Sequence, residues 1–203
     1  VVAPASLRTN SLVDGSDETS TSERVVFDVV PAAPSPAGTA LDVATMLDYA
    51  VTTGQALDAV LVFAHADGDT RVELRDVASG DVLASSVLGE SLTITIRGSD
   101  ADDRLRLGWG DAPEADRVSV LFDGGAGSDT LTGTSTDSAW TVEGRDRGIT
   151  GRARFASVEN LQGTAGTRDT FTVLAEGALS GGLHGGDAGF DTLVLGPGAF
   201  SSI

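Results

Sequence analysis

The chain has 203 residues, 30 of them acidic and 13 basic, and therefore a formal net charge of -17 at pH 7. A surface this acidic repels phosphate groups, which argues against nucleic-acid binding and against anionic membrane surfaces. The sequence has no Cys, which excludes disulfides, thiolate metal sites and cysteine nucleophiles. No apolar run approaches the about 20 residues of a membrane-spanning helix. Abundant glycine and few aromatic residues favour short strands joined by tight turns.

The first segment, residues 1–38, is expected to be a flexible arm and linker. Residues 1–23 are polar and show no hydrophobic period, which is typical of a flexible arm. Residues 24–30 resemble a strand, and the proline-rich residues 31–38 resemble a linker. The chain begins with Val and shows no leader pattern, so we expect it to be processed or cut from a longer protein.

Residues 39–91 are expected to form a β-rich segment with at most one short helix. Leu41, Ala44, Leu47 and Val51 recur at helical spacing, which predicts a helix over residues 39–51. The period then changes to two, which predicts strands. Those strands are expected at residues 57–64, 71–77, 82–88 and 92–96.

An internal repeat dominates the C-terminal half. Each copy consists of an apolar residue, any residue, Gly, a small polar loop, and then Asp, any residue and an apolar residue. The Asp follows the Gly by five or six residues. The four copies span residues 96–105, 122–131, 161–171 and 183–193.

The spacing of the repeat predicts a right-handed parallel β-solenoid over residues 92–203, continuing beyond the given chain. Steps of 26 residues from Asp103 to Asp129 and of 22 from Asp169 to Asp191 each suit one coil. In this interpretation Gly permits a left-handed turn and Asp caps it by accepting hydrogen bonds from turn amides. The apolar residue after each Asp re-enters the core, so we expect four equivalent buried positions. They are Leu105, Leu131, Phe171 and Leu193.

Residues 124–131, with the sequence GGAGSDTL, resemble the nonapeptide of RTX (hemolysin-type) calcium-binding repeats. Residues 185–193 carry the same pattern with one insertion. The connecting segments are similar to those of very large bacterial surface proteins and adhesins of the LEPR-XLL type. The resemblance covers about residues 92–203 and implies Ca2+ as a ligand. The implied ligands are Asp123, Gly125, Gly127, Asp129, Asp187 and Asp191.

The same aspartates have a second interpretation, in which they only cap turns. RTX repeats stack in tandem and share each calcium between consecutive turns, whereas the copies here are isolated. Calcium requires six to eight oxygen ligands, and a single turn supplies few of them. Both interpretations stay open at this point, with turn capping favoured for Asp103 and Asp169.

The function expected from these features is structural or adhesive. The chain would be a repeat segment of a secreted or bacterial cell-surface protein that associates with itself or with neighbouring repeats, as a fibre or surface layer. No nucleophile, phosphate-loop or zinc-protease motif is present, so we expect no enzyme activity.

Two alternatives are a β-helix enzyme acting on polysaccharides and a module that binds surface glycans. The glycan alternative needs a flat row of residues such as Thr130, Thr170 and Thr192, which share one repeat position. A basic stretch from Arg145 to Arg154 is expected to pair with neighbouring acids or to contact an acidic partner.

Overall fold

The computed structural model describes residues 45–197, which belong to one compact unit, Leu41–Ile203. The expected arm and linker, the strand at residues 24–30 and the first part of the expected helix lie outside the described residues. Within residues 45–197 the protein is all-β. Its helical element is a single 3-10 turn, η1 (Pro113–Arg117).

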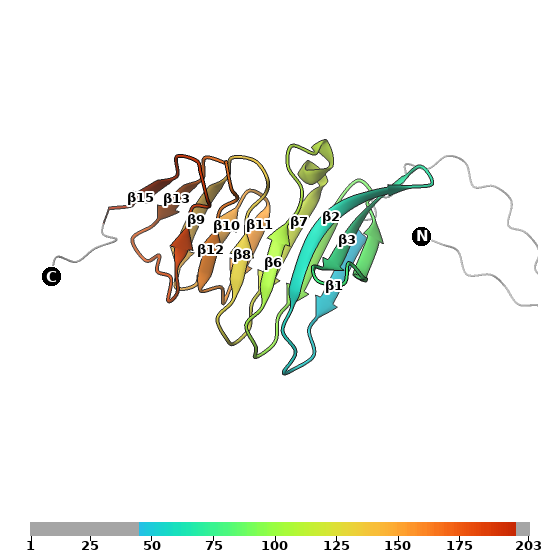
Figure 1. The fold of residues 1–203 in the computed structure, drawn as a ribbon, viewed down its shortest axis with the longest axis horizontal. Helices are drawn as coiled ribbons and strands as arrows, with labels where there is room; N and C mark the ends of the chain where they lie inside the picture. The colour runs from blue at the N-terminus through green and yellow to red at the C-terminus, as the bar shows by residue number, and fades with distance from the viewer. Residues whose placement is uncertain (1–44, 198–203) are drawn as a thin grey trace, which may run out of the picture. The chain divides into compact units, whose positions relative to one another are not determined.

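Fifteen strands form two sheets, named A and B here, and Figure 1 shows the strands of both sheets following one another along the unit. Sheet A has the order β1 (Thr45–Ala50), β5 (Leu92–Arg97), β7 (Val118–Asp123), β11 (Ala153–Ala156), β10 (Arg147–Thr150), β9 (Ala139–Gly144), β13 (Thr170–Val173) and β15 (Thr192–Leu195). Sheet B has the order β14 (Leu183–His184), β12 (Asn160–Gln162), β8 (Thr130–Thr132), β6 (Arg104–Leu107), β2 (Asp58–Ala66), β3 (Asp69–Asp76) and β4 (Val82–Val87).

From β5 onward the chain passes repeatedly from sheet A to sheet B and back, and most neighbours in each sheet pair in parallel. Strands β6, β8, β12 and β14 are consecutive parallel neighbours in sheet B. In sheet A the parallel order is interrupted by β9, β10 and β11, which pair antiparallel. This meander lies within the longest step of the sequence repeat, and it is why that step is longer than the others.

The core lies between the two sheets and is built from aligned apolar rows. In sheet B, Leu105, Leu131 and Leu161 are register neighbours and are at most 1% exposed. In sheet A, Trp140 and Phe171 are register neighbours, and both are fully buried. Burying a side chain of this size stabilises the fold by about 1.5–3 kcal/mol.

Three of the four positions expected to be equivalent and buried are buried, and the fourth is not. Leu105, Leu131 and Phe171 are 0% exposed, whereas Leu193 is 55% exposed. Leu193 is the register partner of Phe171, but its strand β15 is the last of the described strands in sheet A, and β13 is its one partner among them. The four positions also divide between the sheets, because Leu105 and Leu131 lie in sheet B and the other two in sheet A.

The helix expected over residues 39–51 is wrong for the part that is described. Residues Thr45–Ala50 form β1, which pairs in parallel with β5. The pairing places Leu47 opposite Ile94 and Tyr49 opposite Ile96, so its apolar residues alternate toward the core with a period of two. A partner strand distant in sequence therefore overrides the local helical spacing.

The strands expected between residues 57 and 96 are confirmed as β2 to β5. Strands β2 and β3 form a hairpin closed by Asp67 and Gly68, both of which have positive φ. Positive φ at both central residues is the conformation of a tight hairpin turn. Strands β3 and β4 extend sheet B beyond its parallel strands, and β4 contacts β1.

Candidate functional site

The repeated turns lie on two opposite edges of the sheet pair. The turns over residues 98–103 and 124–129 lead from sheet A to sheet B, and we call this side the first edge. The turns over residues 163–169 and 185–191 lead back from sheet B to sheet A, on the second edge. All strands of sheet A except β10 run in one direction. Turns that leave sheet A therefore lie at the C-terminal ends of its strands, and turns that return to it lie at the opposite, N-terminal ends.

On the first edge the turn acids form a ladder of hydrogen bonds between coils. Asp103 accepts the N–H of Leu57 through Oδ1 at 2.5 Å, and Asp129 accepts the N–H of Asp103 in the same way at 2.7 Å. Glu159 Oε2 in turn accepts the N–H of Asp129 at 2.7 Å. Each acid therefore binds the backbone of the preceding coil, and charge-assisted bonds of this kind are stronger than neutral ones.

The second edge carries a matching ladder. Asp169 Oδ1 accepts the N–H of Ser138 at 2.9 Å, and Asp191 Oδ1 accepts the N–H of Asp169 at 2.9 Å. The Ser138 hydroxyl accepts a bond from Trp140 Nε1 at 2.8 Å. This bond connects the ladder to the core, where the Trp140 ring stacks on Phe171 with centroids 5.5 Å apart.

The first glycine of each repeated turn is needed because a larger residue would clash with the turn Asp. It does not have the left-handed backbone that the sequence interpretation expected. Gly98, Gly124, Gly163 and Gly185 are not among the glycines with positive φ. A Cβ at any of them would lie 2.2–2.4 Å from Oδ2 of the Asp of its own turn. The carboxylate therefore packs against the glycine Cα, while its other oxygen binds the neighbouring coil.

Asp129 has the most perturbed environment among these acids. Its side chain is fully buried and its Oδ2 has no hydrogen-bond partner. Burial raises the pKa of Asp129 to about 6, with further upward contributions from the charges of Glu159, Asp103 and Asp102. The hydrogen bond from the Asp103 backbone acts in the opposite direction and lowers the pKa.

The residues implied as calcium ligands are divided between the two edges. Asp123, Gly125, Gly127 and Asp129 lie at the first edge, and Asp187 and Asp191 lie at the second. Gly125 and Gly127 have positive φ, as the sequence interpretation expects of turn glycines. A Cβ at either would lie within 2.6 Å of a backbone carbonyl oxygen of the turn below, at Ser99 or Ala101.

Two of these residues, Asp129 and Asp191, act as turn caps in the conformation observed. Oδ1 of Asp129 and of Asp191 accepts a backbone N–H, and each Oδ2 faces a glycine Cα. Oδ1 of Asp123 is buried without a partner. Over residues 45–197, no three Asp, Glu or His side chains converge in a way that would hold a metal ion.

The threonines of the glycan hypothesis do not form one row. Thr170 and Thr192 are register partners in sheet A. Thr130 lies in sheet B, where its register partners are Arg104 and Asn160. The split follows the repeat itself, because its first two copies end in sheet B and its last two end in sheet A.

Two shallow depressions lie on the described surface. One, of about 390 Å³, is on sheet A and is lined by Thr93, Ser119, Val120, Leu121, Ile149, Gly151, Arg152 and Arg154. The other, of about 440 Å³, is at the second edge and is lined by Asp111, Ser135, Thr136, Asp137, Gly166 and Thr167. Asp137 is occupied there as the acceptor of the Arg168 N–H at 2.8 Å.

Glu159 is the ladder residue that sequence reasoning missed. It stands two residues before buried Leu161, the same relation that Asp103 and Asp129 have to Leu105 and Leu131. The signal was therefore present, with Glu in place of Asp and without the preceding glycine. The longer Glu side chain reaches the Asp129 N–H from a turn of different length.

Comparison with protein-family models, with curated proteins and with solved structures finds no match to this chain. Within the described range, no helix has the length and apolar character needed to cross a membrane.

Proposed function

We propose that the chain is a structural or adhesive repeat segment of a secreted or bacterial cell-surface protein, built as a right-handed parallel β-solenoid. The observation that carries the proposal is the pair of acid ladders, which bind each coil to the next through the backbone. Parallel strands that alternate between two sheets support the solenoid, and right-handed crossovers are the rule for parallel strands. The repeated turn residues therefore serve to hold neighbouring coils together.

The burial and hydrogen bonding of the turn aspartates support a non-enzymatic role. Asp103, Asp129 and Asp169 are buried in turns and serve as hydrogen-bond acceptors, so they are withdrawn from a substrate. The two histidines lie apart, on β2 and β14, and both are exposed. The resemblance of residues 124–131 to repeats of large bacterial surface proteins supports the proposed location.

Surface protease treatment of intact cells, together with electron microscopy, tests this role. We expect a protease added to intact cells to remove the protein, with a cytoplasmic enzyme as the intact control. We expect microscopy of native material to show fibres or a layer, and a panel of polysaccharide, ester and peptide substrates to give no turnover. Protection from the protease would overturn the location. Turnover lost on substitution of one acidic residue would overturn the structural role.

A specific observation favours a second candidate, the binding of acidic glycans at the depression on sheet A. Arg152 and Arg154 border it in a protein of net charge -17, beside the hydroxyls of Thr93 and Ser119. Binding of uronic-acid polysaccharides to the protein, lost in Arg154→Ala, would support this function. The matched control is Arg104→Ala, which removes the same charge from an exposed position on sheet B.

Calcium binding stays a prediction of the sequence resemblance. The ladders give two of the implied ligands, Asp129 and Asp191, a role that needs no ion, since Oδ1 of each accepts a backbone N–H. Thermal melting with calcium and with chelator separates the two explanations, as set out in the Discussion.

A further inference from the structure

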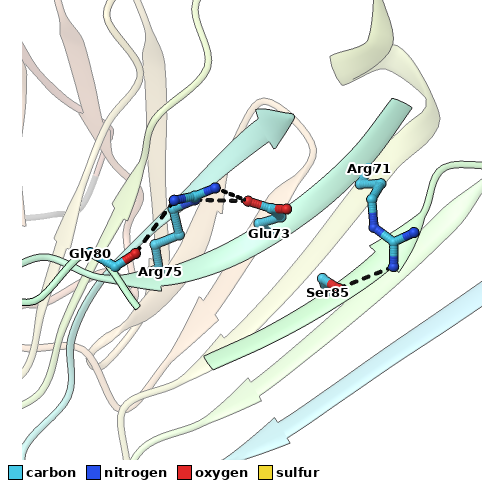
Figure 2. Close-up of polar contacts among 5 residues, drawn as sticks. All are labelled: Arg71, Glu73, Arg75, Gly80 and Ser85. Carbon is cyan, nitrogen blue, oxygen red and sulfur yellow. Dashed lines mark hydrogen bonds and ion pairs between the residues drawn. The ribbon is translucent and has the colours of Figure 1, made fainter. Parts of the chain in front are cut away.

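Arginines in the two sheets differ in how their N–H donors are used. On the β3–β4 hairpin, Arg75 donates through Nε to Glu73 Oε2 at 2.8 Å and through Nη1 to the Gly80 carbonyl at 3.4 Å, as Figure 2 shows. Arg71 donates to the Ser85 hydroxyl at 3.3 Å. Both arginines therefore make contacts within the hairpin.

Arg152, directly before β11, is restrained but keeps most of its donors for another group. Its Nε donates to the backbone carbonyl of Asp116, in η1, at 2.8 Å. Within residues 45–197 this bond uses one of the five N–H donors of the arginine and leaves the four on the terminal nitrogens. Arg152 is exposed and borders the depression on sheet A. It can therefore offer parallel N–H groups to a carboxylate, the geometry that arginine binds best.

Arg154, on the same border, has a weaker partner. Its Nη1 lies 3.6 Å from Oε2 of Glu143, which is an ion pair but is too long for a good hydrogen bond. The two side chains are 63% and 40% exposed, so the pair contributes little stability by itself. A carboxylate that came closer to Arg154 would compete with Glu143 for the same cation.

Apolar side chains lie on both sides of Arg154. Leu121 on β7 and Ile149 on β10 are its register partners, and both line the depression. Leu121 is 42% exposed. Two residues before it on β7, Ser119 is in register with Thr93 on β5. The depression therefore combines two cations, an apolar strip and two hydroxyls.

These features correspond to the parts of a uronic acid. A uronate has a carboxylate at one end of a pyranose ring, C–H groups on the faces of the ring and hydroxyls around it. In a chain of net charge -17, a pair of arginines beside an apolar strip is the local surface that suits such an anion. Charge complementarity of this kind contributes mainly to specificity.

We propose that the depression binds one uronate of an acidic polysaccharide, with the carboxylate on Arg152 and Arg154 and the ring on Leu121. Glu143 limits the affinity, because the ligand must compete with it for Arg154. This inference rests on the acidic-glycan function proposed above, and it gives each of these residues a separate role. Arg152 is the restrained donor, Leu121 the apolar contact and Glu143 the displaceable anion.

Isothermal titration of the full chain with oligogalacturonate tests the role of Glu143. We expect Glu143→Gln to bind about two- to fivefold more tightly than the wild type, because the competing carboxylate is gone. The matched control is Glu176→Gln, which removes the same charge at an exposed residue that does not line the depression, and it should bind like the wild type. The methyl ester of the same oligosaccharide, which lacks the carboxylate charge, should not bind.

Two further variants test the other contacts. Arg152→Lys keeps the charge but loses the planar pair of donors, so binding should weaken by about tenfold. Leu121→Ala should weaken binding, whereas Leu174→Ala, at a leucine that is 40% exposed and does not line the depression, should not. Circular dichroism establishes that each variant is folded.

The outcomes separate this inference from the function on which it rests. Binding that is lost in Arg154→Ala but unchanged in the variants of Arg152, Leu121 and Glu143 would overturn this arrangement and leave the glycan function standing. No binding of oligogalacturonate by the wild type would overturn both, and the structural role would remain. Equal binding of polyglutamate would overturn the assignment to a sugar and identify an acidic protein segment as the partner.

Discussion

The two ends of the sheet pair differ in how far the apolar residues of the core rows are buried. At the β3–β4 end the chain adds an antiparallel hairpin, and Val72 and Leu74 are fully buried. At the β14–β15 end no further strand follows within residues 45–197, and Leu193 is 55% exposed. Burial in stacked strands is thus a property of having neighbours on both sides, and the repeat pattern alone does not provide it.

The largest expected difference is between leucines of the two regions. Leu131→Ala, between β6 and β12, should lower the free energy of unfolding by about 2–5 kcal/mol, because it leaves a cavity in a closed core. Leu193→Ala should cost less than about 1 kcal/mol, because half of its surface already contacts water. Denaturant unfolding of both variants at one protein concentration checks these values. Equal losses would contradict the comparison.

The next effect concerns the glycine of the first-edge turn. In Gly124→Ala the new Cβ would lie 2.2 Å from Ser157 O and 2.4 Å from Asp129 Oδ2, so the turn must move, at a cost of about 1–3 kcal/mol. Gly182→Ala is the control, since its Cβ would come no closer than 3.7 Å to Asn160 Oδ1. Chemical denaturation measures both variants. A tolerated Gly124→Ala would show that the close packing of carboxylate and glycine is dispensable.

A smaller effect depends on pH and distinguishes Asp129, which is buried, from Asp191, which occupies the same repeat position on the second edge but is exposed. The pKa of Asp129 is raised from 3.8 to about 6 in the folded state, so the folded chain binds a proton that the unfolded chain releases. This contribution therefore favours folding at low pH, and it is lost as pH rises from about 4 through 6. Its full size is at most about 3 kcal/mol.

Asp129→Asn keeps an oxygen acceptor for the Asp103 N–H and removes the ionisation. The variant should therefore lose stability less steeply than the wild type between pH 4 and 7, as followed by denaturant midpoints. Asp191→Asn serves as the control, because Asp191 is a ladder acid that is exposed. If Asp129→Asn and the wild type show the same dependence of stability on pH, a group other than Asp129 is responsible for it.

The smallest expected effect is that of calcium. If hydrogen bonding alone explains the ladders, adding calcium or chelator should leave the melting temperature of the wild type unchanged in scanning calorimetry. A rise with calcium that disappears in Asp129→Asn would instead establish the metal site implied by the resemblance. Magnesium at the same concentration controls for screening of the -17 charge.

Much of the strand content and part of the site could be predicted from the sequence. The period of two over residues 57–96 predicted the four strands β2 to β5, and the Gly-to-Asp repeat marked the turns that stack. Those features depend on neighbours in the chain, which set side-chain alternation and turn geometry. The exclusion of disulfides and of thiolate sites follows from composition alone.

Tertiary structure decided the rest, because partners far apart in sequence set it. Residues 45–50 are a strand because β5 pairs with them, in spite of their helical spacing. Glu159 joined the ladder because its turn is stacked against Asp129. Leu193 has the same local sequence context as Leu131, Asp-Thr-Leu, but among the described strands it has a neighbour on one side only. Local sequence determines which face of a strand is apolar, and only the packing of neighbouring strands determines whether that face is buried.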